Sequence, residues 1–300
     1  MSPRLATRPV TIASPATSAN IGPGYDAMGL ALGFGDEITA EVAGDGVVVE
    51  IEGIGAGVLP GDESHLVAST MLTAFDAMGC RPDGLRVRCV NRIPHARGLG
   101  SSSSAIVGAI VAARALVDGG EQLLPDADAL TLASRIEGHP DNVAAALYGG
   151  LTIAWNDLDE VVAWHLPVVA SIVVFVPPYE VSTAQARQLL PAEVPHGDAA
   201  RNAGRAALLV AALTGHPELL LAATQDELHQ AYRSPVMPES FEFMSELRQT
   251  DVPAVISGAG PTVLAFVSAA ADSDTLTDRC PLGWTARALE VANAGAHIIG

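Results

Sequence analysis

One glycine- and serine-rich stretch reads Pro94-His95-Ala96-Arg97-Gly98-Leu99-Gly100-Ser101-Ser102-Ser103-Ser104-Ala105. It follows an alternating run typical of a strand (85–90) and leads into an apolar run long enough for a buried helix (105–113). The glycines let the backbone approach a ligand closely, and the serines suit the first turn of the helix. Free N–H groups and the positive end of the helix dipole favour an anion there. The stretch predicts a phosphate site, although an ordinary capped helix after a glycine turn has the same pattern.

The composition is that of a globular protein. The chain has 300 residues, of which 49% are hydrophobic and 17% charged, enough for one large or two smaller domains. The first residues lack an apolar signal core, and the longest apolar run, 168–176, is too short to cross a bilayer. The scattered residues Cys80, Cys89 and Cys280 indicate neither a disulfide framework nor a zinc site. We therefore expect a soluble, cytoplasmic protein with no membrane partner.

The charged residues exclude several classes of function. A net charge of −18 argues against nucleic acid as a partner, because binding to a phosphate backbone needs a dense positive surface. All 16 basic residues are arginine. The absence of lysine excludes the P-loop that ends in Lys-Ser/Thr, the strand lysine of protein kinases and Schiff-base chemistry. An anionic ligand must therefore be held by a helix dipole, arginines or a metal cation.

Polar residues interrupt the beginning of the chain after a predicted strand at 10–13. The turn Gly22-Pro23-Gly24 brings Asn20 and Asp26 together on an irregular segment. An amide and a carboxylate placed in this way suit a ligand-binding loop. Both side chains would equally suit the capping of local turns, so this segment alone does not decide between the two.

Further along, the pattern predicts alternating strands and helices. Alternating residues on either side of Gly44-Asp45-Gly46 indicate a hairpin over 38–51. A helix is expected over 126–136 and a strand over 147–154. The segment Trp164-His165-Leu166-Pro167 marks the expected boundary between two halves.

A second polar cluster follows the helix predicted at 126–136. Glu137, His139, Asp141 and Asn142 fall within six residues, broken by glycine and proline. Such a concentration is costly to bury without partners or a ligand. Glu137 suits Mg²⁺, which prefers oxygen ligands, and Asp141 could accept a proton from a hydroxyl that His139 and Asn142 orient. A capped helix start and a solvated Glu137 are the simpler interpretation.

The second half offers two arginines and another glycine loop. Thr183 and Arg187 lie in a helix predicted over 182–190, and Arg233 lies at the end of another. A guanidinium presents a planar fork of donors to a carboxylate, although each arginine alone would suit a surface ion pair. The loop Gly258-Ala259-Gly260-Pro261-Thr262 allows either close approach to a ligand or a tight hairpin turn.

Taken together, these motifs resemble the GHMP kinase superfamily. Pro94–Ser104 matches its phosphate motif Pro-x-x-x-Gly-Leu-Gly-Ser-Ser-x-x without a gap, and Ser257–Thr262 is similar to its C-terminal glycine motif. Within the superfamily the chain most resembles the homoserine kinases. Pro15–Asp26, Glu137–Ala144 and Leu228–Arg233 resemble the opening, central and late motifs of that family. The absence of lysine also separates the chain from mevalonate kinase-like members, which use one beside their catalytic aspartate.

The resemblance implies an α+β fold of two domains. The first, over 1–164, would be ATP-binding and similar to domain 2 of ribosomal protein S5. The second, over 165–289, would be ferredoxin-like, and a segment of about 290–300 would return to the first. The implied reaction is Mg²⁺-dependent phosphorylation of the side-chain hydroxyl of L-homoserine by ATP, giving O-phospho-L-homoserine and ADP in threonine biosynthesis. Relatives are often dimers, so the resemblance allows a homodimer.

The resemblance also assigns roles to residues. The stretch 94–104 would bind ATP, with Ser102 and Glu137 at Mg²⁺. The amino acid would be surrounded by Asn20, Asp26, His139, Asn142, Thr183, Arg187, Arg233, Gly258 and Gly260. Asn142 would contact the reacting hydroxyl, and Asp141 stays a candidate base. A kinase for another small alcohol and a silent ligand sensor are the alternatives, but the retained serines and Glu137 argue against a sensor.

Overall fold

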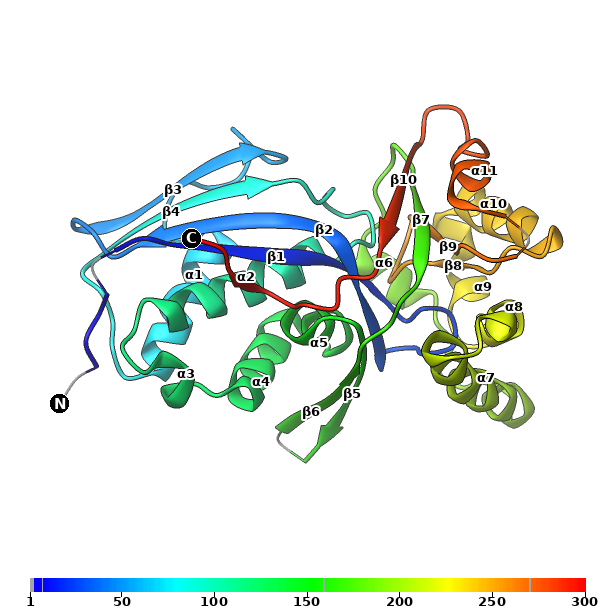
Figure 1. Ribbon diagram of the computed structural model, residues 1–300, viewed down its shortest axis with the longest axis horizontal. Helices are drawn as coiled ribbons and strands as arrows, with labels where there is room; N and C mark the ends of the chain where they lie inside the picture. Colours follow the sequence, from blue (N-terminus) through cyan, green and yellow to red (C-terminus); the bar gives the residue numbers. More distant parts are fainter. Residues whose placement is uncertain (1–2, 7, 159, 270) are drawn as a thin grey trace.

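The computed structural model describes residues 3–6, 8–158, 160–269 and 271–300, whose strands form two sheets (Figure 1). The first sheet has the order β11-β1-β2-β4-β3, with β5 beside β2 and β6 beside β5, and the second has the order β10-β7-β9-β8. The strands of the first sheet are β1 (Val10–Ala19), β2 (Met28–Glu41), β3 (Gly46–Gly53), β4 (Gly84–Asn91), β5 (Leu151–Asp157), β6 (Glu160–Leu166) and β11 (His297–Ile298). Those of the second are β7 (Ser171–Val176), β8 (Ala254–Ile256), β9 (Val263–Phe266) and β10 (Thr285–Glu290).

The prediction of a hairpin over 38–51 is wrong. Both of its strands form, but β4 lies between them, antiparallel to β2 and parallel to β3. A parallel pair needs a long crossover connection, and helix α1 (Leu66–Ala77) lies between β3 and β4 in the chain. Alternation of apolar and polar residues therefore located the strands correctly but did not identify their partners.

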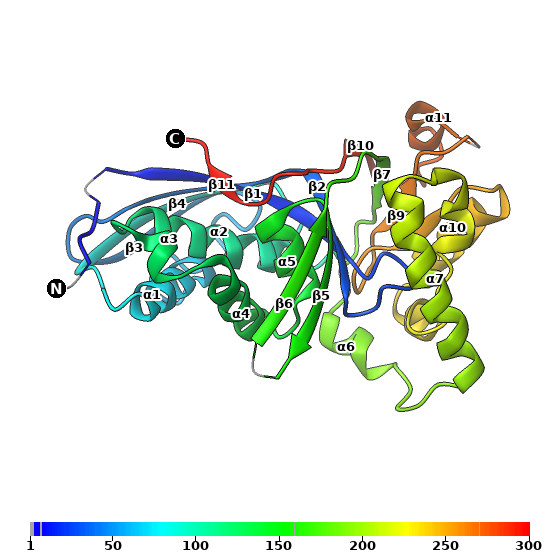
Figure 2. The same cartoon turned by 60° about the horizontal axis from the view of Figure 1, so that its bottom comes forward.

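Helices cover one face of the first sheet (Figures 1 and 2). They are α1, α2 (Ser101–Ala115), α3 (Gly120–Leu123), α4 (Asp126–Glu137) and α5 (Asp141–Tyr148). Phe75 of α1, Ile110 of α2 and Leu85 of β4 are buried in one core cluster beneath this sheet. Burying a side chain such as Phe75 stabilises the fold by about 1.5–3 kcal/mol. The strand expected over 147–154 begins only at Leu151, because α5 continues to Tyr148.

The second sheet is covered on both faces. Its helices are α6 (Thr183–Gln188), α7 (His196–Thr214), α8 (Leu220–Ala223), α9 (Gln230–Arg233), α10 (Pro238–Gln249) and α11 (Ser273–Thr277), with 3₁₀ turns at Pro217–Leu219 and Ser234–Val236. Val173 and Phe175 of β7 belong to the core cluster that includes α10. The alternate residues Ile172 and Val174 belong to another cluster, which contains residues of α7 and of β2. This second cluster joins the two sheets, and the cavity described below lies close to their junction.

The end of the chain returns to the first sheet. After β10, β11 pairs antiparallel with β1, with His297 opposite Ala13 and Ile298 opposite Ile12. Among the described residues, no helix is both long enough and apolar enough to cross a membrane.

Candidate active site

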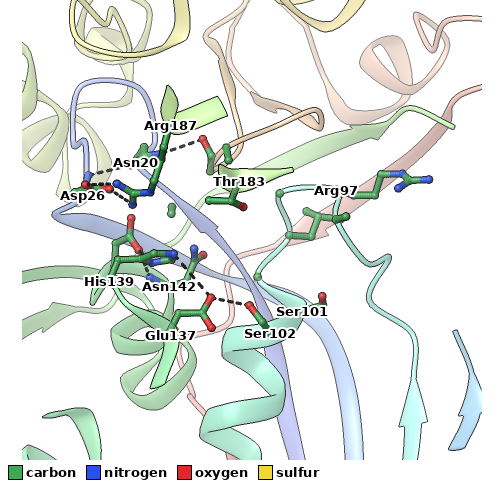
Figure 3. A pocket seen from close by; sticks show the side chains of 18 of the residues that line it. Asn20, Asp26, Arg97, Ser101, Ser102, Glu137, His139, Asn142, Thr183 and Arg187 are labelled. Atoms are coloured by element: carbon green, nitrogen blue, oxygen red, sulfur yellow. Dashed lines mark hydrogen bonds and ion pairs between the residues drawn. The ribbon is translucent and has the colours of Figure 1, made fainter. Parts of the chain in front are cut away.

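A cavity opens where the starts of α2 and α5 and the end of α4 meet α6 and α9 of the second half (Figure 3). Its walls include most of the site residues predicted from sequence, namely Asn20, Asp26, Pro94, Ala96, Arg97, Gly98, Leu99, Gly100, Ser101, Ser102, Glu137, His139, Asp141, Asn142, Thr183, Arg187, Arg233 and Gly258. Ala19 and Ala259 complete the lining. Segments more than 200 residues apart in the chain therefore meet around one space.

Two glycines, Gly98 and Gly100, shape the backbone at the start of α2. Gly98 and Gly100 have φ of 71° and 65°, in the left-handed region that favours glycine. Gly100 is the N-cap, and no described side chain caps the helix, so the first N–H groups of α2 are left for a ligand at the cavity wall. The Ser257 hydroxyl donates to the Gly98 carbonyl at 2.6 Å and fixes this loop against the second glycine loop.

We expect Gly98→Ala to raise the KM for ATP at least tenfold and to lower the melting temperature. A Cβ there would collide with the Ser257 carbonyl and lie 2.8 Å from the Gly260 carbonyl oxygen. Gly57→Ala is the matched control, because φ is 72° at Gly57 and no atom lies within 4 Å of the added Cβ. The control should show only the cost of a left-handed alanine, about 1–2 kcal/mol. Equal losses in the two variants would refute the importance of the close contact.

Glu137 is tied to the serines at the start of α2. Its Oε1 accepts hydrogen bonds from the hydroxyls of Ser102 at 2.6 Å and Ser103 at 2.9 Å. The Glu137 side chain is only 10% exposed, so it is not the solvated carboxylate of the simpler interpretation. The described residues contain no group of three or more His, Cys, Asp or Glu side chains placed to hold a metal. The oxygens of Ser102 and Glu137 therefore suit Mg²⁺ shared with a bound phosphate better than a cation enclosed by protein alone.

Asp141 organises its neighbours at the start of α5. Its Oδ1 lies 2.8 Å from Nδ1 of His139 and accepts the N–H of Asn142 at 2.7 Å. Burial tends to lower the pKa of His139, but the hydrogen bond and charge of Asp141, aided by Glu137, raise it overall. The Asn142 amide oxygen accepts from the buried Thr17 hydroxyl at 2.7 Å, which leaves the amide nitrogen for a ligand.

Asp26 and Arg187 form a two-point ion pair inside the cavity, visible in Figure 3. Nη2 and Nη1 of Arg187 lie 2.8 and 3.0 Å from the two carboxylate oxygens. Burial would raise the pKa of Asp26, but the hydrogen bonds and charge of Arg187 lower it overall. Asn20 accepts the Asp26 N–H and donates to the Gly258 carbonyl, so it joins this loop to the second glycine loop.

Arg233 is almost fully buried, with 1% of its surface exposed, and is not a surface ion-pair partner. Its Nη1 lies 3.3 Å from both the Gly258 carbonyl and Nδ1 of His229. The guanidinium lies over the Tyr25 ring, 5.4 Å from its centre. Burial lowers the pKa of Arg233, and the neighbouring charge of Arg187 acts in the same direction. The guanidinium groups of Arg187 and Arg233 and the carboxylate of Asp26 therefore lie together on one side of the cavity.

Four of the predicted site residues, His95, Ser103, Ser104 and Gly260, do not line the cavity. Ser103 instead supports Glu137, and Ser104 exchanges hydrogen bonds with Ser14 of β1. A Cβ at Gly260 would collide with the Met237 sulfur, and the φ of 86° lies in the left-handed region that favours glycine.

Arg97 lines the cavity, but its side chain turns away from it (Figure 3). Its guanidinium donates to the carbonyls of Pro177 and Pro178 at 3.1 and 2.8 Å. The side chain thus fixes the glycine loop to the segment that leads into α6.

Sequence reasoning did not single out Thr17, Tyr25 and His229, which contact site residues. Thr17 holds Asn142, while the Tyr25 hydroxyl accepts from Arg187 at 3.3 Å. Thr17 and Tyr25 lie in the same motif as Asn20 and Asp26, and His229 lies one helical turn before Arg233. That proximity in sequence was the available signal, but it could not indicate the contacts.

Comparisons with known proteins agree with this geometry. The model of the GHMP kinases N terminal domain matches residues 65–150, and that of GHMP kinases C terminal matches 206–281. The homoserine kinase of Streptomyces avermitilis is 52% identical over 99% of this chain and 98% of its own, and that of Streptomyces coelicolor is 53% identical over 99% and 96%. The crystal structure of homoserine kinase from Cytophaga hutchinsonii aligns with a TM-score of 0.82 at 27% identity, covering 97% of each chain. The predicted fold class is thereby confirmed, and the chain belongs to the homoserine kinase family of the GHMP kinases.

Proposed function

We propose that the protein transfers the terminal phosphoryl group of ATP to the side-chain hydroxyl of L-homoserine, giving O-phospho-L-homoserine and ADP for threonine synthesis. The observation that carries this proposal is the composition of one cavity. It combines an uncapped helix start, suited to phosphate, with Asp26, Arg187 and Arg233, suited to the two charges of an amino acid. Relatives of the same name at about half identity support it.

The nucleotide end of the cavity is assigned to the loop 94–102. The N–H groups at the start of α2 would bind phosphate oxygens, and Ser102 and Glu137 would hold Mg²⁺. Bound Mg²⁺ would neutralise phosphate charge during transfer. The proposed domains are 1–164 and 165–289, with about 290–300 returning to the first; the first sheet itself extends to Leu166 at the end of β6, and β10 of the second sheet ends at Glu290.

The amino-acid end is assigned to the charged residues. Asp26 would bind the ammonium group, and Arg187 and Arg233 would bind the carboxylate. The amino acid would be enclosed further by Asn20, His139, Thr183 and Gly258, which line the same cavity. Asp26 and Arg187 bind each other in the structure, so binding of both charges of the amino acid would separate this pair.

Asn142 is assigned to the reacting hydroxyl through its amide nitrogen, since Thr17 occupies the amide oxygen. Asp141 uses Oδ1 to hold His139 and the N–H of Asn142, so acceptance of the hydroxyl proton would fall to its other oxygen. Phosphoryl transfer with a loose transition state needs little activation of the nucleophile. Positioning of the two substrates is therefore the main contribution that these residues make.

The test measures ADP release from MgATP with purified protein and L-homoserine, D-homoserine, L-serine, L-threonine, galactose or mevalonate. We expect strong, Mg²⁺-dependent turnover with L-homoserine alone. Turnover of another alcohol in its place would overturn the substrate. Binding of ATP without turnover of any alcohol would favour a ligand sensor.

A further inference from the structure

His229 is a fully buried histidine at the start of α9 that lies behind the cavity wall. Its Nε2 lies 2.8 Å from the carbonyl oxygen of Gly22, and its Nδ1 lies 3.3 Å from Nη1 of Arg233. The imidazole therefore connects the loop that carries Asp26 to an arginine of the cavity wall. None of the roles assigned above uses it.

The two partners determine which nitrogen carries the proton. A carbonyl oxygen can only accept a hydrogen bond, so Nε2 must be protonated, whereas a guanidinium can only donate, so Nδ1 must be unprotonated. A proton on Nδ1 would face the positive charge of Arg233 without an acceptor. The Asp226 carboxylate lies 3.5 Å from Nε2, but its oxygens already accept the N–H groups of Leu228, His229 and Gln230.

The neutral state agrees with the electrostatic surroundings of the ring. Burial lowers the pKa of His229 below its ordinary value, although the Asp226 charge acts in the opposite direction. The adjacent Arg233 lowers it further.

The remaining donors of Arg233 are left for a ligand. Nη1 is occupied by His229 and by the Gly258 carbonyl, and the Tyr25 ring supports the guanidinium plane. Nε is buried and has no partner among the described residues. A buried donor without a partner costs about 1–3 kcal/mol, which a carboxylate accepting from the edge formed by Nε and Nη2 would recover.

We propose that His229 is a positioning residue for the carboxylate of the amino acid, because its unprotonated Nδ1 fixes Nη1 of Arg233 and so orients the Nε–Nη2 edge for that carboxylate. This inference rests on the proposed function, since it assumes an α-amino acid in the cavity. It assigns specificity to a side chain that the amino acid itself need not touch.

Two substitutions separate the two hydrogen bonds of the ring. In His229→Gln the longer amide can still donate to Gly22 but offers no acceptor at the place of Nδ1. In His229→Asn the shorter amide offers an oxygen there but loses the bond to Gly22. We expect His229→Gln to raise the KM for L-homoserine about tenfold, with the KM for ATP changed less than about twofold. His229→Asn should restore most of the affinity.

An analogue locates the effect at the carboxylate. For 3-aminopropan-1-ol, which is homoserine without its carboxylate, kcat/KM should be nearly equal in the wild type and in His229→Gln. The exposed His216, changed to glutamine, is the matched control and should leave both KM values unaltered. If His229 only stabilised the fold, His229→Gln and His229→Asn would each raise the KM for ATP and the KM for L-homoserine by similar factors. The variant with the lower melting temperature would then show the larger rise in both. That result would overturn the inference.

A measurement without substrate tests the protonation state of His229 independently of activity. Nitrogen-15 spectra of the histidine rings at neutral pH should show His229 protonated at Nε2 only, with the signal assigned through its loss in His229→Gln. Protonation at Nδ1 would overturn the inference even in a fully active enzyme. Failure of the wild type to phosphorylate L-homoserine would instead overturn the proposed function and this inference with it.

Discussion

Replacing Glu137 by glutamine is expected to lower kcat about 10²–10³-fold, with the KM for L-homoserine changed less than about threefold. The substitution keeps the size of the side chain and removes its charge. The Ser102 and Ser103 hydroxyls can still donate to the amide oxygen, so the local structure should persist. The loss would therefore report on the charge that is needed to hold Mg²⁺ against the phosphates.

The measurement is steady-state turnover across a Mg²⁺ titration, together with thermal unfolding. We expect the Mg²⁺ concentration at half-maximal rate to rise in Glu137→Gln, while the melting temperature moves by only a few degrees. Glu160→Gln, at the exposed first residue of β6, is the matched control and should behave as wild type. Full turnover of Glu137→Gln with an unchanged Mg²⁺ requirement would remove Glu137 from the metal site.

Arg233→Met should raise the KM for L-homoserine on the order of 100-fold, with the KM for ATP changed less than about threefold. Methionine keeps an apolar stem of similar length, but it lacks the guanidinium that lies over the Tyr25 ring and cannot bind a carboxylate. The site would lose one of its two guanidinium groups and retain Arg187.

Initial rates with each substrate varied in turn test this assignment. Arg81→Met is the matched control, because its side chain is 53% exposed and pairs with Asp76 at the surface. Thermal unfolding of both variants shows whether removal of a buried arginine weakens the fold. A similar rise in the KM of both substrates in Arg233→Met would contradict carboxylate binding by this residue.

Sequence alone indicated the parts of the site that depend on local pattern. Gly98 and Gly100 predicted a sharp turn before an apolar helix. The structure has this turn, and both glycines have left-handed backbone conformation. The polar run from Glu137 to Asn142 was expected to have partners or a ligand, and it lies on the cavity wall. Such features are encoded within a dozen residues, so pattern and turn chemistry suffice to find them.

Features that depend on distant pairing could not be found in this way. The sequence of β3 is typical of one strand of a hairpin with β2. In the structure β3 instead pairs with β4, which follows it after the crossover through α1. Ser103 looks equivalent to Ser102, yet helix geometry places only Ser102 on the cavity wall. The role of His229 depends on which atoms face its two nitrogens, and these come from Gly22 and Arg233.

The ion pair between Asp26 and Arg187 has a consequence for discrimination among ligands. Because the two charges already neutralise each other, binding at this place is an exchange of partners rather than a gain of new ones. A simple carboxylic acid or amine that enters would satisfy one member and leave the other half-buried and unmatched. A molecule that carries both charges restores neutrality on both sides. With the proposed roles of Asp26 and Arg187, this ion pair would make singly charged alcohols poor competitors, even those of the right size.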